Sequence, residues 1–291
     1  MATSDATTRF LASSIAAAIA ETATLPTDVA KVRLQVQVSA GGAPLYTGLV
    51  DCLRKTAAAE GVAACWKGLQ PALLRQVFYS SLSLVLYEPV RDAVAAATGG
   101  ADAGAAPTFA QRLLAGGTAG AISISVFNPT EVVKTQMQAA AASTSMGSVV
   151  RGVYREGGVA AFWAGIGPNV ARTFLVNAAE LGTYDEAKSR LVPLVGDNAA
   201  AHVGASGVAG VASALTSTPA DVVKTRLMGA AGGPRVYSGV LDAFATIVRT
   251  EGVLALYKGF VPIVVRKVLW CSAFFLCYER LRVGLRAREK I

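Results

Sequence analysis

The sequence has few charged residues and few of the side chains that metal sites and enzymes use. Charged residues make up only 16% of the 291 positions, whereas hydrophobic residues make up 53%. A water-exposed surface is hard to build from so little charge, so the composition favours a membrane protein. There is one histidine, His202, and the four cysteines lack metal-site spacing. The sequence therefore predicts no zinc site, and it predicts small buried apolar thiols at Cys52, Cys65, Cys271 and Cys277.

Other absences narrow the function further. The net charge is +8, but the sequence has no lysine-arginine block and no RNA-binding signature, so a nucleic-acid partner is not expected. No nucleophile-base pair or phosphate loop is present, which argues against an enzyme and against a bound cofactor. The first fourteen residues hold one arginine and one aspartate, and Leu11 already begins an apolar run, so no cleavable targeting peptide is expected.

One motif occurs three times, and it defines an internal repeat. In each copy a small-residue-rich apolar run enters a proline, an acid follows two residues later, and a lysine follows three after that. Repeats of this kind are stronger evidence of architecture than any single motif. We predict repeats at 1–100, 101–197 and 198–291. The copies are Pro26-Thr27-Asp28-Val29-Ala30-Lys31, Pro129-Thr130-Glu131-Val132-Val133-Lys134 and Pro219-Ala220-Asp221-Val222-Val223-Lys224.

Each repeat continues with the same elements. A short amphipathic helix is expected at about Leu49 to Ala59, followed by Glu60-Gly61 and Trp66-Lys67-Gly68. The third repeat has Glu251-Gly252 and Tyr257-Lys258-Gly259 at the same spacing. The middle repeat departs from this pattern: an additional Gly158 follows Glu156-Gly157, and Trp163-Ala164-Gly165 lacks the base.

A second apolar segment then carries an arginine, an acid and a base in fixed register. The six apolar segments are long enough to cross a bilayer as helices. The stretches inside each repeat are basic, whereas the linkers between repeats, Ala96 to Pro107 and Val192 to Ala199, contain no lysine or arginine. This asymmetry places both termini on the side opposite the basic stretches. In the second apolar segments, the arginines are Arg75, Arg172 and Arg266. The acids, each preceded by a tyrosine, are in Tyr87-Glu88, Tyr184-Asp185 and Tyr278-Glu279, and the bases are Arg91, Lys188 and Arg282.

Taken together, these motifs resemble the mitochondrial carrier family. The resemblance covers essentially the whole chain and implies an all-α membrane protein, in which six transmembrane helices form a threefold pseudosymmetric barrel with three short matrix helices. It also implies a monomer in the mitochondrial inner membrane with a central site reached alternately from each side. The runs Ala30–Gln35, Gly167–Arg172 and Asn177–Leu181 resemble the uncoupling protein branch, particularly plant members, beside the dicarboxylate and oxoglutarate carriers. Lys267-Val268-Leu269 departs from a Leu-Gly-Ser run of that branch.

The three arginines are the candidate substrate-binding residues. An arginine at membrane depth is costly, so each is expected to face a water-filled cavity and bind an anion. Guanidinium groups bind carboxylates bidentately, which suits small di- or tricarboxylates and acidic amino acids. The alternative is that each arginine only pairs with a neighbouring acid. By resemblance these are substrate contact points, and Arg172-Thr173 resembles dicarboxylate-type rather than ADP/ATP carriers.

Glu21 and Glu180 are further acids within the apolar segments. Either could be protonated in a low-dielectric cavity and so couple proton movement to transport. The alternative is a fixed ion pair with one of the arginines. Asn177 and Trp270 are expected to line the same cavity, although Trp270 could instead pack within the barrel.

The repeated acids and bases are interpreted as two interhelical rings. Asp28, Glu131 and Asp221 would pair with Lys31, Lys134 and Lys224 of neighbouring helices and close the matrix side. Gln35 and Gln138 would brace these pairs, whereas Met228 cannot. The second set would form a cytosolic ring from Glu88, Asp185 and Glu279 with Arg91, Lys188 and Arg282.

Glycines near the short helices suggest a lipid partner. Helix N-termini with free amides bind phosphate groups, so anionic lipid, by resemblance cardiolipin, could bridge repeats there. Simple turn glycines are the alternative. The candidates are Gly48, Gly68, Gly239 and Gly259.

The sequence thus predicts a carrier that exchanges small carboxylates by alternating access. The uncoupling branch suggests a second hypothesis, a regulated proton leak with fatty acid and nucleotide as effectors. A third hypothesis is a carrier-fold adaptor that has lost transport. The intact arginines and both sets of charged residues argue against the adaptor.

Overall fold

All three repeats contain the same series of helices. The computed structural model describes residues 2–37, 44–98, 108–140, 144–196, 199–230 and 237–288. Within these stretches each repeat has a long helix, a short helix, a 3-10 helix and a second long helix. The bounds are α1 Ala2–Val36, α2 Leu49–Glu60, η1 Val62–Trp66 and α3 Leu69–Ala97; α4 Phe109–Ala139, α5 Met146–Gly157, η2 Val159–Trp163 and α6 Ile166–Val195; α7 Ala199–Gly229, α8 Val240–Glu251, η3 Val253–Tyr257 and α9 Phe260–Arg288.

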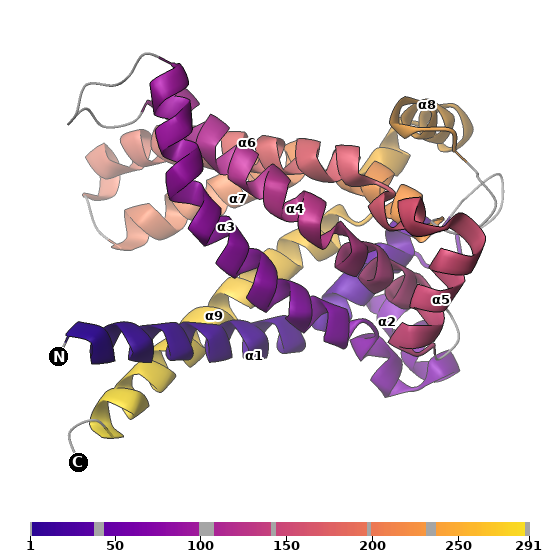
Figure 1. Ribbon diagram of the computed structural model, residues 1–291, viewed down its shortest axis with the longest axis horizontal. Helices are drawn as coiled ribbons and strands as arrows, with labels where there is room; N and C mark the ends of the chain where they lie inside the picture. The colour runs from indigo at the N-terminus through magenta and orange to yellow at the C-terminus, as the bar shows by residue number, and fades with distance from the viewer. Residues whose placement is uncertain are drawn as a thin grey trace.

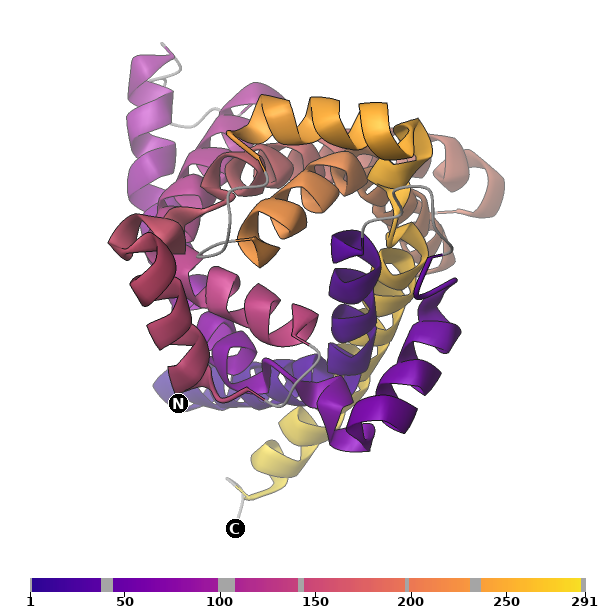
Figure 2. The same ribbon diagram turned by 90° about the vertical axis from the view of Figure 1, so that its right-hand side faces the viewer.

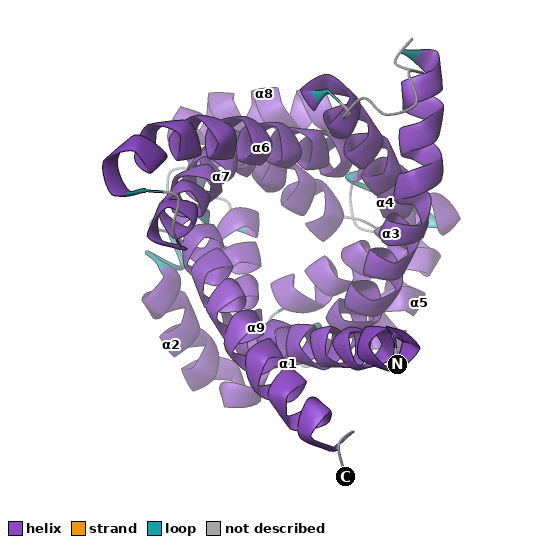
Figure 3. Ribbon diagram, turned by 90° about the vertical axis from the view of Figure 1, so that its left-hand side faces the viewer, coloured by secondary structure: helices purple, strands orange, loops and turns teal. Residues whose placement is uncertain are grey.

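The long helices are arranged around one central axis. Seen along this axis, they form a closed ring, and α2, α5 and α8 lie around its outside at one end (Figure 2). The N- and C-termini lie together at the opposite end (Figure 1). Seen from that end, the described residues form helices joined by loops, with no strand (Figure 3). The predicted all-α barrel is confirmed.

Within the described parts of the chain, two segments are recognisable as membrane spans from length and mean hydropathy alone. They are Val159–Pro193, with a mean hydropathy of 1.2, and Val253–Leu281, with 1.8. Very few of their residues are buried inside the protein, as expected for helices that face lipid.

The repeated prolines lie inside α1, α4 and α7, where each lacks the N–H that would bond to the carbonyl four residues earlier. The repeated tryptophans supply the missing donor. Trp66 Nε1 donates to the Thr22 carbonyl at 2.9 Å, and Trp163 Nε1 donates to the Ser125 carbonyl at 2.8 Å. Each carbonyl lies four residues before its proline, so the aromatic residue of the motif satisfies the group that the proline leaves unpaired.

We expect Trp66→Phe to lower the free energy of unfolding by about 1 kcal/mol, because it removes this donor and keeps an aromatic ring. The measurement is thermal unfolding of the detergent-purified protein. Tyr257→Phe is the matched control, since Tyr257 occupies the same motif position without an indole. Equal melting temperatures for the Trp66 variant and wild type would contradict this role.

Three glycines at the start of the second long helices require the absence of a side chain. Gly68, Gly165 and Gly259 have φ of 82°, 69° and 84°, in the left-handed region that favours glycine. A Cβ on Gly165 would lie 3.0 Å from Met228 Cγ, and one on Gly259 would lie 3.0 Å from Gln35 Cγ. These glycines let each second helix begin directly against the end of a neighbouring first helix. By contrast, Gly48 and Gly239 have extended backbone with open space around them.

Candidate functional site

Three ion pairs join α1, α4 and α7 into a ring, which we call the proline-motif ring: Asp28, Lys31, Glu131, Lys134, Asp221 and Lys224. Lys134 Nζ lies 2.9 Å from Asp28 Oδ2, Lys224 Nζ lies 2.7 Å from Glu131 Oε2, and Lys31 Nζ lies 3.1 Å from Asp221 Oδ2. Each pair therefore links two different repeats, and the three pairs close the circle. Within one helix the acid and lysine of a motif are not paired in these contacts.

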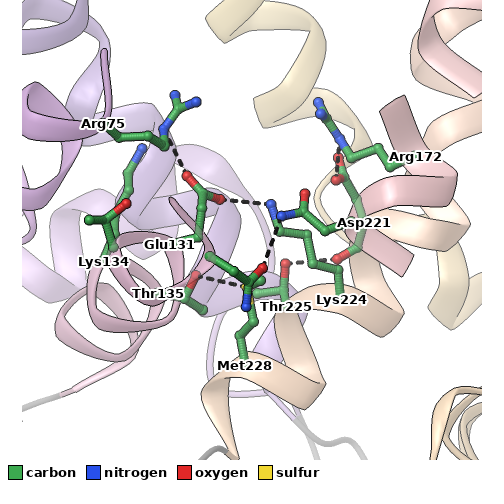
Figure 4. Close-up of polar contacts among 12 residues, drawn as sticks. Arg75, Glu131, Lys134, Thr135, Arg172, Asp221, Lys224, Thr225 and Met228 are labelled. Atoms are coloured by element: carbon green, nitrogen blue, oxygen red, sulfur yellow. Dashed lines mark hydrogen bonds and ion pairs between the residues drawn. The ribbon is translucent and has the colours of Figure 1, made fainter. Parts of the chain in front are cut away.

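Each acid of the ring also contacts an arginine from a second long helix. Arg75 Nε lies 2.8 Å from Glu131 Oε1, and Arg172 Nε lies 2.5 Å from Asp221 Oδ1. In the third case Arg266 Nε lies 2.5 Å from an Asp28 oxygen. Figure 4 shows Glu131 between Arg75 and Lys224, with the outer guanidinium nitrogens of Arg75 and Arg172 pointing away from the carboxylates. Each of the three arginines therefore pairs with a ring acid in the structure, and its role in substrate binding stays a prediction.

The arginines and the ring surround one central cavity of about 140 Å³. Six bases and three acids line it, so its lining carries an excess of positive charge. Thr173 and Asn169 also line it, and Thr173 Oγ1 donates to the Asn169 carbonyl at 3.2 Å. Its bases are Lys31, Arg75, Lys134, Arg172, Lys224 and Arg266.

The two intramembrane glutamates have different surroundings. Glu21 is 1% exposed, and its carboxylate lies 2.9 Å from Arg266 Nη2 and 3.4 Å from Lys134 Nζ. The Glu21 carboxylate therefore forms a buried ion pair with these two cations. Glu180 contacts Lys267 of α9, rather than an arginine. Sequence reasoning missed Lys267, although the departure from the Leu-Gly-Ser run was the signal that could have found it.

A second cavity of about 310 Å³ lies beside the first, and we call it the side chamber. Its lining comes mainly from α6, α7 and α9, and it shares Lys31, Arg172 and Arg266 with the central cavity. Trp270 lines this chamber and stacks on Phe274 at a centroid distance of 5.2 Å, so it both lines a cavity and packs. Asn177 does not line either of these two cavities. Its Nδ2 would lie 3.8 Å from a Cβ built on Gly116 of α4.

Among the described side chains predicted for the cytosolic ring, Glu88, Arg91 and Glu279 make no ion pair with another helix. Arg91 Nη2 contacts Asp92, its neighbour on α3, at 2.9 Å. Glu88 and Glu279 are exposed, and the described side chains include no base within ion-pair distance of either. Lys188 is half-buried on α6. The side chains of Asp185 and Arg282 lie outside the described set.

The predicted braces contact the ring differently from what we expected. Gln35 Oε1 accepts a hydrogen bond at 2.8 Å from Thr225 Oγ1 rather than from a ring lysine. Thr225 directly follows Lys224 in the sequence. Gln138 is buried, and its Nε2, like that of Gln35, has no hydrogen-bond partner among the described atoms. At the third position Met228 Sδ lies 3.8 Å from Thr135 Oγ1, which is a weak contact.

A cluster missed at the sequence level holds the short helix of the first repeat against α4, and we call it the first clamp: Arg33, Glu60 and Lys67. Arg33 Nη2 donates to Glu60 Oε2 at 2.9 Å, and Lys67 Nζ contacts the same carboxylate at 2.5 Å. Arg33 Nε also donates to the Gln138 carbonyl at 3.1 Å. The first repeat is thereby fastened to the end of α4 in the second repeat.

The third repeat has the same arrangement in Arg226, Glu251 and Lys258, the second clamp. Arg226 contacts Glu251 and donates from Nε to the Gln35 carbonyl at 2.9 Å. Lys258 Nζ lies 2.6 Å from Glu251 Oε2. This clamp fastens the third repeat to the end of α1.

The second repeat lacks all three clamp residues. Gly158 has a φ of 64° and is the structural equivalent of Gly61 and Gly252. The residue before this glycine is a glutamate in the other two repeats, but here it is Gly157, and Glu156 lies one residue too early. Gln136 replaces the arginine and Ala164 replaces the lysine. Gln136 Nε2 donates to the Met228 carbonyl at 3.2 Å, and this bond replaces the charged contacts. The junction between α4 and α7 is therefore the least charged of the three.

The second clamp predicts a pH dependence of stability. Burial raises the pKa of Glu251, but hydrogen bonds from Arg226 and Lys258 outweigh it and lower the pKa to about 2 from the ordinary 4.5. Because the folded pKa is depressed, this stabilisation is complete above pH 4.5 and is lost as the pH falls toward 2. We expect the difference in free energy of unfolding between wild type and Glu251→Gln to be constant from pH 7 to 5. It should narrow by roughly 1–2 kcal/mol by pH 3.

Thermal unfolding at each pH measures this difference. Glu156→Gln on the exposed side of α5 is the control for a glutamate outside both clamps. A difference that stays unchanged down to pH 3 would contradict the assignment.

Among the described residues no cluster of three or more histidine, cysteine or acidic side chains could hold a metal ion. Cys52 and Cys65 are buried, as predicted for apolar thiols, and burial raises the pKa of both. The same prediction is wrong for Cys271, which is exposed, and for Cys277, which is half-buried. Both lie on α9, and Cys271 lines the side chamber.

Comparison with known proteins identifies the family. A family model described as "Mitochondrial carrier protein" matches residues 2–97, 105–193 and 196–289. Mitochondrial uncoupling protein 1 of Arabidopsis thaliana is 38% identical over 95% of this chain and 93% of its own length. Mitochondrial brown fat uncoupling protein 1 of Canis lupus familiaris is 35% identical over 94% and 91%. The Danio rerio protein named Dicarboxylate carrier UCP2 is 34% identical over 98% and 94%.

These matches cover almost all of the chain, and they agree with the helical barrel and its three repeats. Proteins of this kind are transporters rather than enzymes, and they are multi-pass proteins of the mitochondrial inner membrane. The chain belongs to the mitochondrial carrier family.

Proposed function

We propose that this carrier exchanges small carboxylates, namely dicarboxylates, oxo acids or acidic amino acids, by alternating access. The observation that carries the proposal is the central cavity, whose lining has six bases and three acids and whose end is closed by three interhelical ion pairs. An excess of guanidinium and ammonium groups in a water-accessible cavity favours an anion with more than one carboxylate. The name of the Danio rerio relative, a dicarboxylate carrier, supports this substrate class.

The double role of the ring acids suggests how binding could open the proline-motif ring. Asp221 holds both Arg172 and Lys31, and Glu131 holds both Arg75 and Lys224. A substrate carboxylate that binds an arginine competes with the ring acid for it. The ring acid then loses one of its two cations, so the substrate offsets the cost of separating the helices.

In this proposal the proline-motif ring is the matrix gate, and it is closed in the structure. The tyrosine-motif residues, including Glu88, Arg91, Lys188 and Glu279, would form the cytosolic gate when the proline-motif ring separates. Closing one set as the other separates would expose the cavity to the two sides in turn. Anionic lipid such as cardiolipin would bind near α2 and α8, and the carrier would act as a monomer.

Proton leak is the second candidate, because several relatives are named uncoupling proteins. Glu180 is the carboxylate best placed for proton coupling, since its side chain is 38% exposed and lines the side chamber. Glu21, at 1% exposure between two cations, is poorly placed for it.

Reconstitution in liposomes separates the two candidates. Labelled malate or aspartate uptake would be compared with proton flux, each with and without internal substrate. Exchange requires uptake that depends on internal carboxylate, with little proton flux in its absence. Proton flux without carboxylate uptake would favour the leak and reject the exchanger.

The methionine at the third brace position predicts a weak point in the matrix gate. Glutamine at 228 would face the Thr135 hydroxyl, as Gln35 faces Thr225, and would add a hydrogen bond worth about 1 kcal/mol. We therefore expect Met228→Gln to slow exchange by about fivefold, since 1.4 kcal/mol is tenfold in rate. Met228→Leu is the control, because it keeps an apolar side chain at this position. An unchanged exchange rate in Met228→Gln would count against a role of residue 228 in the matrix gate.

A further inference from the structure

Three long helices meet at one polar cluster in the side chamber, the Lys267 cluster: Lys267 of α9, Glu180 of α6 and Ser213 of α7. Lys267 Nζ contacts the Glu180 carboxylate and lies 3.0 Å from Ser213 Oγ. Ser213 Oγ also donates to Glu180 Oε1 at 3.0 Å. All three side chains line the same chamber as Arg172 and Arg266. Lys267 is thus a further cation in a chamber that Lys31, Arg172 and Arg266 also line.

The backbone of α7 leaves room for the lysine. A Cβ built on Gly210 would lie 3.8 Å from both Lys267 Cδ and Cε, so the aliphatic part of the lysine already lies against the glycine. The lysine side chain therefore packs along α7 at Gly210, and its amino group lies in the chamber.

The Lys267 pair differs from the matrix gate in its exposure. The side chains of Lys267 and Glu180 are 40% and 38% exposed, whereas that of Asp221 in the gate is 1% exposed. An ion pair in contact with water contributes little to stability, about 0–1 kcal/mol. It can therefore be exchanged for another pair at little cost. An incoming carboxylate could replace Glu180 as the partner of Lys267.

We infer that Lys267 binds the second carboxylate of a dicarboxylate whose first carboxylate is held by Arg172 and Arg266. This inference rests on the proposed carboxylate exchange, and it adds a specificity-determining residue to it. The substrate then lies off the central axis, in the side chamber, rather than equally between the three arginines. A monocarboxylate engages the arginines alone and gains nothing from Lys267.

Three substitutions with different expected effects test the inference. Lys267→Met keeps the aliphatic side chain and removes the charge, so the succinate concentration for half-maximal thermal stabilisation of the purified carrier should rise about tenfold or more. Lys267→Arg should retain wild-type binding within a few-fold. Glu180→Gln removes the competing carboxylate, so it should lower that concentration several-fold. The concentration required for the monocarboxylate lactate should not change in Lys267→Met.

Lys55→Met is the matched control, because Lys55 is an exposed lysine on α2 that pairs with Asp51 far from the chamber. A purely structural ion pair predicts that both Lys267→Met and Glu180→Gln weaken binding. That result, or wild-type succinate binding in Lys267→Met, would overturn the inference. If wild type binds succinate but does not exchange it in liposomes, the proposed function fails while the inference stands. A wild-type carrier that binds no dicarboxylate would overturn both.

Discussion

Arg172→Ala is expected to reduce the uptake of labelled dicarboxylate by about 100-fold or more in liposomes loaded with the same substrate. Arg172 is the arginine that lines both the central cavity and the side chamber and also contacts a 1% exposed ring acid. Its removal deletes a charge-assisted contact with the substrate and leaves Asp221 with one cation fewer. Truncating one partner of such a pair costs about 2–5 kcal/mol, and each 1.4 kcal/mol is tenfold.

Arg190→Ala is the matched control for this experiment. Arg190 lies on the same helix, is 77% exposed and pairs with Glu186 one turn away. It should leave uptake unchanged. Uptake by Arg172→Ala at the wild-type rate would remove Arg172 from the substrate site.

Asp221→Asn should lower the free energy of unfolding by about 3–5 kcal/mol, the usual cost of removing one partner from a buried ion pair. The Asp221 carboxylate bridges Lys31 at 3.1 Å and Arg172 at 2.5 Å, and its side chain is 1% exposed. The asparagine variant leaves two cations without their anion. Thermal unfolding of the purified carrier measures the loss.

The exposed Asp242 on α8 provides the comparison, since its carboxylate accepts a hydrogen bond from the Ser238 amide and lies outside the ring. Asp242→Asn should lower stability by less than about 1 kcal/mol. An Asp221 variant as stable as Asp242→Asn would show that the ring does not hold the matrix side together.

Much of the fold could be predicted because its signals repeat in the sequence. The amphipathic stretch expected at Leu49 to Ala59 is the helix Leu49–Glu60, a difference of one residue at its end. The spacing of acid and lysine after each proline also suggested interhelical pairs, since three copies around an axis can satisfy one another. Lys134, Lys224 and Lys31 do lie beside acids of other helices.

What could not be predicted depends on which elements become neighbours in space. The sequence shows Arg33 only as one of several bases, whereas its partners include a carbonyl at Gln138 in the next repeat. The alternative in which each arginine pairs with an acid did not identify that acid, because the ring acids were assigned to the lysines. A carboxylate has two oxygens, and in Glu131 each contacts a different cation.

The middle repeat shows a further limit. The Glu156-Gly157 dipeptide matches Glu60-Gly61 as letters, but the left-handed backbone is at Gly158. Only the backbone reveals the one-residue offset and the loss of the complete clamp. The side chain of Lys267 is a similar case, because its contact with Glu180 depends on the approach of α6 to α9.

The most direct test of alternating access is the labelling of a cysteine in the central cavity from each side of the membrane. Thr173→Cys, in a carrier whose Cys271 and Cys277 are replaced by alanine, would be exposed to a membrane-impermeant thiol reagent in oriented liposomes. Without substrate, labelling should occur only from the side of the chain termini, because the matrix gate is closed. With dicarboxylate on both sides, labelling should occur from both. Labelling from both sides without substrate, or from one side only during exchange, would contradict the account.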